Sequence, residues 1–355
     1  MLHTCAPRLG LSQGLTSLWA LATAVIICGC AATEQKPVAK PILPVVGAGA
    51  TFPYPLYRAW FSEFERREQV RMDYFAVGSQ EGVRLLEHGD ADFAATDRPS
   101  VASANRGRAA CDRIVVPMVS GPLSVVYHLP STNGDVPLRL DAGVTADIFA
   151  GRITRWNAGQ IRALNPQRSL PDLRIVVVHR ASGSGTSRAF ANYLATSGRW
   201  SKDGADDTSE VRWPVGIAAE GNAGVALEVK VREGAIGYVE LSYARQNRLD
   251  VAALRVASGA LAAPGDRAEP YPATGVTWLV IDPARVAAPV ARALVHFIEW
   301  AQTDGAAQAT ALEYTLPAPD SIAFYHAMLD RVPFESCGAT RSGSAARGRG
   351  RALER

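Results

Sequence analysis

The sequence of 355 residues is long enough for two domains of ordinary size, and 48% of its residues are apolar, which suffices for their cores. Its net charge is only +3, and no basic stripe with interleaved aromatic residues is present, which excludes a nucleic-acid-binding protein. The six histidines include no close pair, and no histidine and acidic residues have the spacing of metal ligands, so neither a metal site nor a cofactor is expected.

The first thirty residues are typical of a leader that directs a bacterial protein out of the cytoplasm. One early charge, Arg8, precedes an apolar run from Leu15 to Ile27, which is shorter than the ~20 residues that span a bilayer. The run Ile27-Cys28-Gly29-Cys30 resembles a lipobox, in which the cysteine after a small residue is acylated. We therefore expect residues 1–30 to be a lipoprotein signal peptide with Cys30 lipidated, and an ordinary cleaved signal is the alternative. The mature protein would be periplasmic or at the cell surface, lipid-anchored to a bacterial membrane.

Two further segments are expected to lack regular structure. Residues 31–44 are polar and proline-bearing without a helical or strand period, which suits a flexible tether. Residues 338–355 are rich in Gly, Ser, Ala and Arg and are expected to be disordered. Beyond the leader the chain has two cysteines, Cys111 and Cys337. Export permits a disulfide between them, and two free thiols are the alternative.

From Val45 onward, short apolar runs alternate with amphipathic helical runs, which predicts an α/β protein. Helices are expected over Leu56–Phe64, Ser79–Glu87, Thr145–Phe149, Ile161–Leu164, Phe190–Leu194, Ala223–Val231 and Pro289–Gln302. Strands are expected over Arg71–Val77, Asp92–Ala95, Leu123–Leu129, Leu173–Val178, Ala235–Val239 and Tyr271–Ile281. Ser79 has the position and the side chain of a helix N-cap.

Four short stretches carry residues of the types that suit the binding of a small tetrahedral oxyanion. Three of them stand where a strand is followed by a helix, and there unpaired N–H groups and the helix dipole favour an anion. The fourth supplies a carboxylate, which suits an anion site only if the anion carries a proton, and this favours phosphate. The stretches are Gly47-Ala48-Gly49-Ala50-Thr51-Phe52, Gly78-Ser79, Thr96-Asp97 and Arg180-Ala181-Ser182-Gly183-Ser184-Gly185-Thr186. Taken singly, each also fits a structural role as a turn, a helix cap or a surface arginine.

Together with four further motifs, one of which extends the Thr96-Asp97 stretch, these stretches resemble the PstS family, the phosphate-binding proteins of bacterial ABC phosphate importers. The similarity runs in order from about Val45 to about Leu316. The motifs that extend it are Asp92-Phe93-Ala94-Ala95-Thr96-Asp97, Asp147-Ile148-Phe149-Ala150-Gly151-Arg152-Ile153-Thr154-Arg155-Trp156, Gly221-Asn222-Ala223-Gly224 and Gly234-Ala235-Ile236-Gly237-Tyr238-Val239-Glu240.

The resemblance implies a type II periplasmic binding protein fold, with two lobes joined by two hinge strands and a ligand cleft between them. Lobe I would comprise residues 45–128 and 272–337, and lobe II residues 129–271. The phosphate-binding residues it implies are Thr51, Phe52, Ser79 and Asp97 on lobe I, and Arg180, Ser184, Gly185 and Thr186 on lobe II. The resemblance further implies that the protein is a monomer, is not an enzyme, and interacts with the permease and ATPase subunits of an importer.

The sequence departs from the family pattern at two places. Ser182 stands where the family commonly has an acidic residue beside the arginine, so a shift toward the phosphate dianion is expected. Gln80 and Glu81 follow Gly78-Ser79 where small residues are usual, and Glu81 is compatible with an anion site only if it points outward.

Two other functions remain alternatives. A phosphate-ester hydrolase could use Ser184 as nucleophile, but the nearest base, His179, precedes Arg180 on a strand, where alternation turns the two side chains to opposite faces. A binding protein for another oxyanion, such as molybdate or sulfate, conflicts with Asp97, because an ionised carboxylate can only accept hydrogen bonds and repels an unprotonated oxygen.

Overall fold

The computed structural model describes residues 43–98, 111–130, 136–181, 183–200, 211–266 and 269–337. The predicted signal peptide with Cys30 and the predicted disordered tail, 338–355, lie outside these ranges. Among the described residues, no helix is both long and apolar enough to span a membrane.

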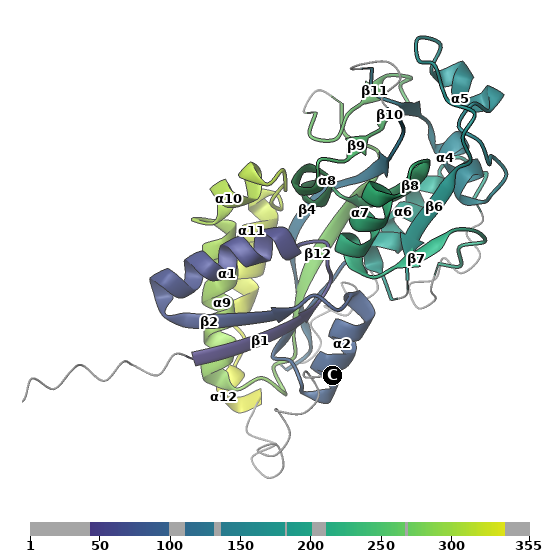
Figure 1. Cartoon of the computed structure of the whole chain (residues 1–355). Coiled ribbons are helices and arrows are strands. Elements are labelled where there is room, and N and C mark those ends of the chain that lie inside the picture. The colour runs from purple at the N-terminus through teal and green to yellow at the C-terminus, as the bar shows by residue number, and fades with distance from the viewer. Residues whose placement is uncertain are drawn as a thin grey trace, which may run out of the picture. The chain divides into compact units, whose positions relative to one another are not determined.

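Strands and helices alternate along most of the chain, as predicted for an α/β protein (Figure 1). The strands are β1 (Leu43–Gly49), β2 (Val70–Phe75), β3 (Phe93–Thr96), β4 (Ile114–Tyr127), β5 (Arg139–Leu140), β6 (Val176–Arg180), β7 (Ile217–Ala219), β8 (Ala235–Glu240), β9 (Asp250–Val251), β10 (Ala253–Arg255), β11 (Leu261–Ala262) and β12 (Thr274–Ile281). The helices are α1 (Tyr54–Glu68), α2 (Ser79–His88), α4 (Ala142–Phe149), α5 (Gly159–Leu164), α6 (Gly185–Ala195), α7 (Gly221–Val231), α8 (Leu241–Asn247), α9 (Ala288–Gln302), α10 (Ala306–Ala311), α11 (Pro319–Leu329) and α12 (Phe334–Cys337).

Helix α1 follows the period of its apolar side chains, and all five residues predicted to face inward are buried: Leu56, Tyr57, Trp60, Phe61 and Phe64. They pack in the main core, where the Phe61 ring lies 5.1 Å from that of Phe297 on α9. Proline at the second position of the helix is tolerated there because it removes an N–H that has no partner within the helix.

The first sheet segment is covered on both faces. Successive side chains of β3 alternate, so that Phe93 and Ala95 join the core beneath α1 and α9, while Ala94 packs against Leu86 of α2. Figure 1 accordingly shows α1 and α2 to either side of the β1–β2 pair. This packing fixes the start of α2 beside the ends of β1 and β3.

Strand β4 connects two halves of one sheet, whose strand order is β2-β1-β3-β12-β4-β8-β6-β7. Its first part pairs antiparallel with β12 as far as Pro122, and from Leu123 it pairs antiparallel with β8. The first part runs parallel to β1, β2 and β3, whereas β6, β7 and β8 run against its second part. The carboxyl ends of both sets of strands therefore point toward the junction at Pro122 and Leu123, where open α/β sheets bind ligands.

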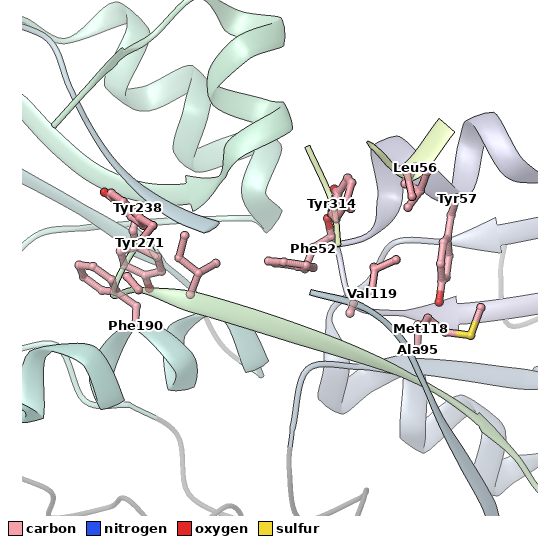
Figure 2. Close-up of a cluster of buried hydrophobic side chains, with 14 of the residues drawn as sticks. Phe52, Leu56, Tyr57, Ala95, Met118, Val119, Phe190, Tyr238, Tyr271 and Tyr314 are labelled. Atoms are coloured by element: carbon pink, nitrogen blue, oxygen red, sulfur yellow. Dashed lines mark hydrogen bonds between the residues drawn. The ribbon is translucent and has the colours of Figure 1, made fainter. Parts of the chain in front are cut away.

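The second half of the sheet has its own aromatic packing. The rings of Phe190 on α6 and Tyr238 on β8 are stacked with their centroids 4.3 Å apart, and Trp213 contacts both. Figure 2 shows Phe190, Tyr238 and Tyr271 as one group, apart from the group around Phe52, Tyr57 and Tyr314. The predicted helix with inward Phe190, Tyr193 and Leu194 is confirmed as α6.

Several predicted boundaries were wrong. The predicted tether extends too far, because Leu43 and Pro44 already pair with Val70 and Arg71 in the sheet. The predicted strand over Leu173–Val178 starts later and runs on to Arg180 as β6. Its first residues are taken by a turn at Leu173 and by a bridge between Arg174 and Arg155.

The two cysteines outside the leader form a disulfide. Cys111, which precedes β4, and Cys337, the last residue of α12, are bonded with their Cα atoms 5.5 Å apart. Of the two alternatives left by the sequence, the structure has the disulfide.

Candidate functional site

The turn between β1 and α1 presents two residues at the strand-end junction. Thr51 is buried, and so is the ring of Phe52, which packs edge-on against Tyr314 with ring centroids 5.8 Å apart (Figure 2). Because its side chain belongs to the core, Phe52 can offer a ligand only its backbone N–H. That N–H makes no hydrogen bond to any residue that the structure describes.

The start of α2 lies next to Asp97. The helix begins at Ser79, and its N-cap residue is Gly78, with φ of 99°, so the prediction of Ser79 as N-cap was wrong by one residue. The Ser79 hydroxyl instead accepts a hydrogen bond of 3.2 Å from the Asp97 N–H. The Gln80 N–H donates to the carbonyl oxygen of Gly183 at 3.1 Å, which joins the start of α2 to the turn before α6.

The carboxylate of Asp97 is buried and held by hydroxyl groups. Thr186 donates to Oδ2 at 3.1 Å and Thr277 donates to Oδ1. Burial raises the pKa of Asp97 to about 6, against the opposing effects of the Thr277 and Thr186 hydrogen bonds and the Arg180 charge. At neutral pH the group is therefore mainly ionised, and each oxygen can still accept another hydrogen bond.

Arg180 ends β6 with a guanidinium that is 4% exposed. Its Nη1 donates to Thr51 Oγ1 at 3.0 Å, and its Nε is buried without a hydrogen-bond partner in the structure as described. Burial lowers the pKa of Arg180, yet an arginine stays charged in proteins. No described carboxylate comes within 4.0 Å of this cation, so its charge is not neutralised by an ion pair.

The turn from β6 into α6 carries three more predicted residues, of which Gly185 and Thr186 lie against Asp97. Ser184 is the N-cap of α6 and accepts a 3.1 Å hydrogen bond from the Ser187 N–H. Gly185 packs so closely that a Cβ atom there would lie 2.6 Å from Cβ of Asp97 and 2.9 Å from Oγ of Ser79. Only glycine permits this approach of the α6 N-terminus. Ser182, the predicted departure, lies outside the described residues.

The structure thus brings the eight predicted residues together at one place, through direct contacts of Thr51 with Arg180, Ser79 with Asp97, and Asp97 with Thr186. A groove of about 450 Å³ along α2 reaches this place at Ser79 and Gly183. Glu81 lines the groove, accepts a 2.7 Å hydrogen bond from Arg84 and remains half-exposed. Its charge is therefore paired with Arg84 and partly in solvent, which is compatible with an anion site.

Sequence reasoning missed three residues that contact the site. Asn222 donates to Thr51 Oγ1 at 2.9 Å, Thr277 donates to Asp97, and the Tyr243 hydroxyl donates to the Thr51 carbonyl oxygen at 2.8 Å. Asn222 stands in the motif Gly221-Asn222-Ala223-Gly224, so the sequence did carry a signal for it. Thr277 and Tyr243 lie within an ordinary strand and helix, and nothing local distinguishes them.

The catalytic alternative finds little support in the geometry. His179 turns its Nδ1 toward the Arg180 carbonyl oxygen, 2.9 Å away, and stacks on Trp213. Within the described part of the chain, no acidic or histidine side chain hydrogen-bonds the Ser184 hydroxyl, and no group of His, Cys, Asp and Glu could hold a metal ion. The arrangement is chemically suited to holding an anion through one cation, several N–H and hydroxyl donors, and one acceptor.

Comparison with known proteins agrees with this description. Residues 31–305 match the model of the PBP superfamily domain. A phosphate-binding protein PstS from Pasteurella multocida is 32% identical over 307 residues, covering 78% of this chain and 87% of that protein. A phosphate-binding protein PstS from Xylella fastidiosa is 31% identical over 349 residues, covering 86% of this chain and 94% of that protein.

Solved structures share the fold. A putative phosphate ABC transporter substrate-binding protein from Clostridium perfringens, solved with bound phosphate, superposes with a TM-score of 0.59 at 19% identity. The match covers 78% of this chain and 100% of that one.

Proposed function

Because the chain belongs to the PBP superfamily and, within it, to the PstS family of phosphate-binding proteins, we propose that it binds inorganic phosphate outside the cytoplasmic membrane and delivers it to an ABC importer. It has the family's two-lobed type II periplasmic binding protein fold. The permease and ATPase subunits of the importer would be its partners.

The observation that carries this proposal is the buried guanidinium of Arg180, which forms no ion pair within 4.0 Å with any residue that the structure describes. A buried charge without a partner is costly, and the cost is recovered when an oxyanion fills the place of the missing carboxylate. A guanidinium binds two oxygens of one phosphate in a fork, and its free Nε is part of such a fork. The ligand therefore completes the site.

Neutral donors would hold the remaining oxygens. We assign to the phosphate the hydroxyls of Thr51, Ser79 and Ser184 and the N–H groups of Phe52 and Gly185. The Thr186 hydroxyl, whose hydrogen goes to Asp97 in the structure, would donate to the phosphate by turning away from that carboxylate. The two amides stand at the starts of α1 and α6, where the helix dipole adds to the attraction.

Asp97 would select for the protonated anion. Phosphate near neutral pH keeps one or two protons, and the ionised carboxylate can accept one of them in a hydrogen bond, whereas sulfate has none to give. A buried acceptor left unpaired beside like charge rejects the wrong ligand by ~10⁴-fold.

The division into lobes would serve capture and release. We propose lobe I as residues 45–128 and 272–337 and lobe II as residues 129–271, with β4 and the connection into β12 as hinges. Because β4 exchanges β12 for β8 between Pro122 and Leu123, bending there would separate Thr51 from Arg180. A lipid at Cys30 would tether a monomer to the membrane and keep it near the importer.

The proposal is tested by calorimetry and thermal shift with phosphate, sulfate and molybdate on the purified mature chain. Phosphate alone should raise the melting temperature at pH 7.5, because a ligand that binds only the folded state stabilises it in proportion to RT ln(1 + [L]/Kd). Arg180→Ala should weaken phosphate binding by about 3 kcal/mol, roughly a hundredfold in Kd, while Arg155→Ala at the exposed Asp172 pair should not. Equal stabilisation by all three anions would refute the proposal.

The hydrolase alternative has its own measurement. Release of phosphate from a chromogenic ester, abolished by Ser184→Ala and retained by Ser187→Ala, would favour it over binding. We expect no turnover, because the Ser184 hydroxyl lacks a base among the described residues.

A further inference from the structure

Two residues on the other side of the junction donate hydrogen bonds to Thr51, although neither is assigned to the phosphate itself. Tyr243 stands on α8 and Asn222 on α7, 192 and 171 residues further along the chain than Thr51. On the basis of the proposed phosphate site, we propose that Tyr243 and Asn222 are positioning residues. Their hydrogen bonds to Thr51 direct the Phe52 N–H and the Thr51 hydroxyl hydrogen toward the bound anion.

Tyr243 acts on the Phe52 N–H through the geometry of the peptide bond. The Thr51–Phe52 peptide is trans and planar, so the Thr51 carbonyl and the Phe52 N–H point in opposite directions. The Tyr243 hydroxyl holds that carbonyl at 2.8 Å and thereby turns the N–H away from α8. Burial raises the pKa of Tyr243 far above its ordinary value, so the hydroxyl keeps its proton and remains a donor.

Asn222 acts on the hydroxyl group of Thr51, whose hydrogen-bonding capacity is limited. Thr51 Oγ1 receives three donors, namely Arg180 Nη1 at 3.0 Å, Asn222 Nδ2 at 2.9 Å and the Asn222 N–H at 3.3 Å. A hydroxyl has two lone pairs and one hydrogen, so these donors occupy its acceptor side. The O–H bond of Thr51 must therefore point in the remaining direction, where no described residue accepts its hydrogen. A phosphate oxygen bound there would accept it.

Asn222 is itself fixed in the orientation that this role requires. Its side chain is fully buried, and its Oδ1 accepts the Glu240 N–H at 3.2 Å, which assigns Nδ2 to the Thr51 side. The residue before it, Gly221, has φ of +63°, and a Cβ atom there would lie 3.3 Å from Thr51 Cγ2. The start of α7 is therefore built to lie directly against Thr51. When phosphate draws Arg180 away, Asn222 still holds the hydroxyl.

Tyr243→Phe tests the first half, because it removes one oxygen from a buried ring. We expect the Kd for phosphate to rise about tenfold, mainly through faster dissociation in stopped-flow traces. Tyr271→Phe is the matched control, since that buried hydroxyl also donates to a carbonyl, of Ala252, but touches no site residue. It should leave the Kd within twofold of the parent. Equal Kd values for both variants would overturn the role of Tyr243.

A double-mutant cycle tests the second half. Asn222→Ala should raise the Kd about tenfold in the parent but less than twofold in a Thr51→Val background, where no hydroxyl remains to be aimed. A purely structural Asn222 would cost the same in both backgrounds, and that result would overturn the proposal. If the parent itself fails to bind phosphate, the proposed function falls with it, whereas a binding parent with unchanged variants removes only the positioning role.

Discussion

The hydroxyl of Tyr314 lies 2.7 Å from Oε2 of Glu240, in a pair that is buried from solvent. The same hydroxyl lies 2.8 Å from the Phe52 carbonyl oxygen, although it has one hydrogen to donate. The one tyrosine hydrogen would have to be shared between these two oxygens if Glu240 is ionised, whereas a protonated Glu240 can donate to Tyr314 and leave that hydrogen to Phe52. Burial independently raises the pKa of Glu240 to about 8.

This pair predicts a pH dependence of stability that Glu240→Gln removes. The carboxyl pKa is raised from 4.5 in the unfolded chain to about 8 in the folded one. The folded state therefore binds the extra proton in this window, and stability is greatest below it and is lost as the pH rises toward 8, by at most about 1.4 kcal/mol per pH unit. A glutamine side chain can donate to Tyr314 as the protonated acid does. The unfolding free energy of the Glu240→Gln variant should therefore fall less between pH 6 and 8 than that of the parent.

Urea titrations at several pH values measure this slope in the absence of phosphate. Glu228→Gln is the control, because that residue forms a surface pair with Arg232. If the unfolding free energies of the parent and of Glu240→Gln change with pH in parallel, Glu240 is ionised in the folded protein.

Asp97 predicts a pH dependence of anion selectivity. With a pKa of about 6, Asp97 is ionised at pH 8 and mainly protonated at pH 5. The protonated carboxyl group can donate a hydrogen bond to a sulfate oxygen. Sulfate binding to the parent should thus emerge below pH 6. Asp97→Asn donates at every pH, so it should keep the fold and reduce the discrimination against sulfate at pH 8 by about a hundredfold or more. Calorimetry with both anions decides, with Asp73→Asn at an exposed pair as the control.

Local patterns in the sequence determined much of the fold. The helical period placed all five inward residues of α1, and the apolar run Leu123–Leu129 located the second part of β4. The first part of β4 was missed, because Pro117, Gly121 and Pro122 interrupt its pattern. Pro117 lies at the irregular part of the pairing with β12, where the register shifts between Thr277 and Trp278, and Pro122 is the last residue of β4 paired with β12.

The parts of the site that could be predicted are those formed by residues close together in the sequence. A glycine turn before a helix can be read from the sequence, and so can an arginine at a strand end, and the structure puts these stretches together at the strand-end junction. Contacts such as Tyr243 with Thr51 could not be predicted, because they depend on how two halves of the sheet meet. The raised pKa of Glu240 could not be predicted either, since the burial that causes it depends on the whole fold.

The disulfide predicts a loss of stability without a loss of binding. Cys111 and Cys337 close a loop of 226 residues, which in the chain-entropy model restrains the unfolded state by about 5 kcal/mol. The double variant Cys111→Ser, Cys337→Ser should unfold at a lower temperature and bind phosphate like the parent, since neither residue contacts the site. Reducing the parent should lower its melting temperature equally. A melting temperature that is insensitive to reductant would contradict this prediction.

Gly185→Ala should prevent the two sides of the site from meeting. The added Cβ would lie 2.6 Å from Asp97 Cβ and 2.9 Å from the Asp97 carbonyl carbon, so either α6 or the backbone at Asp97 must move. We expect the Kd for phosphate to rise at least about tenfold, because Thr186 and the α6 N-terminus retreat from the anion together. Gly159→Ala is the matched control: Gly159 is likewise the first residue of a helix, and a Cβ there would meet nothing within 4 Å. Calorimetry should give this control the parent's affinity, and an equally tight Gly185→Ala variant would mean that phosphate binds without this close approach.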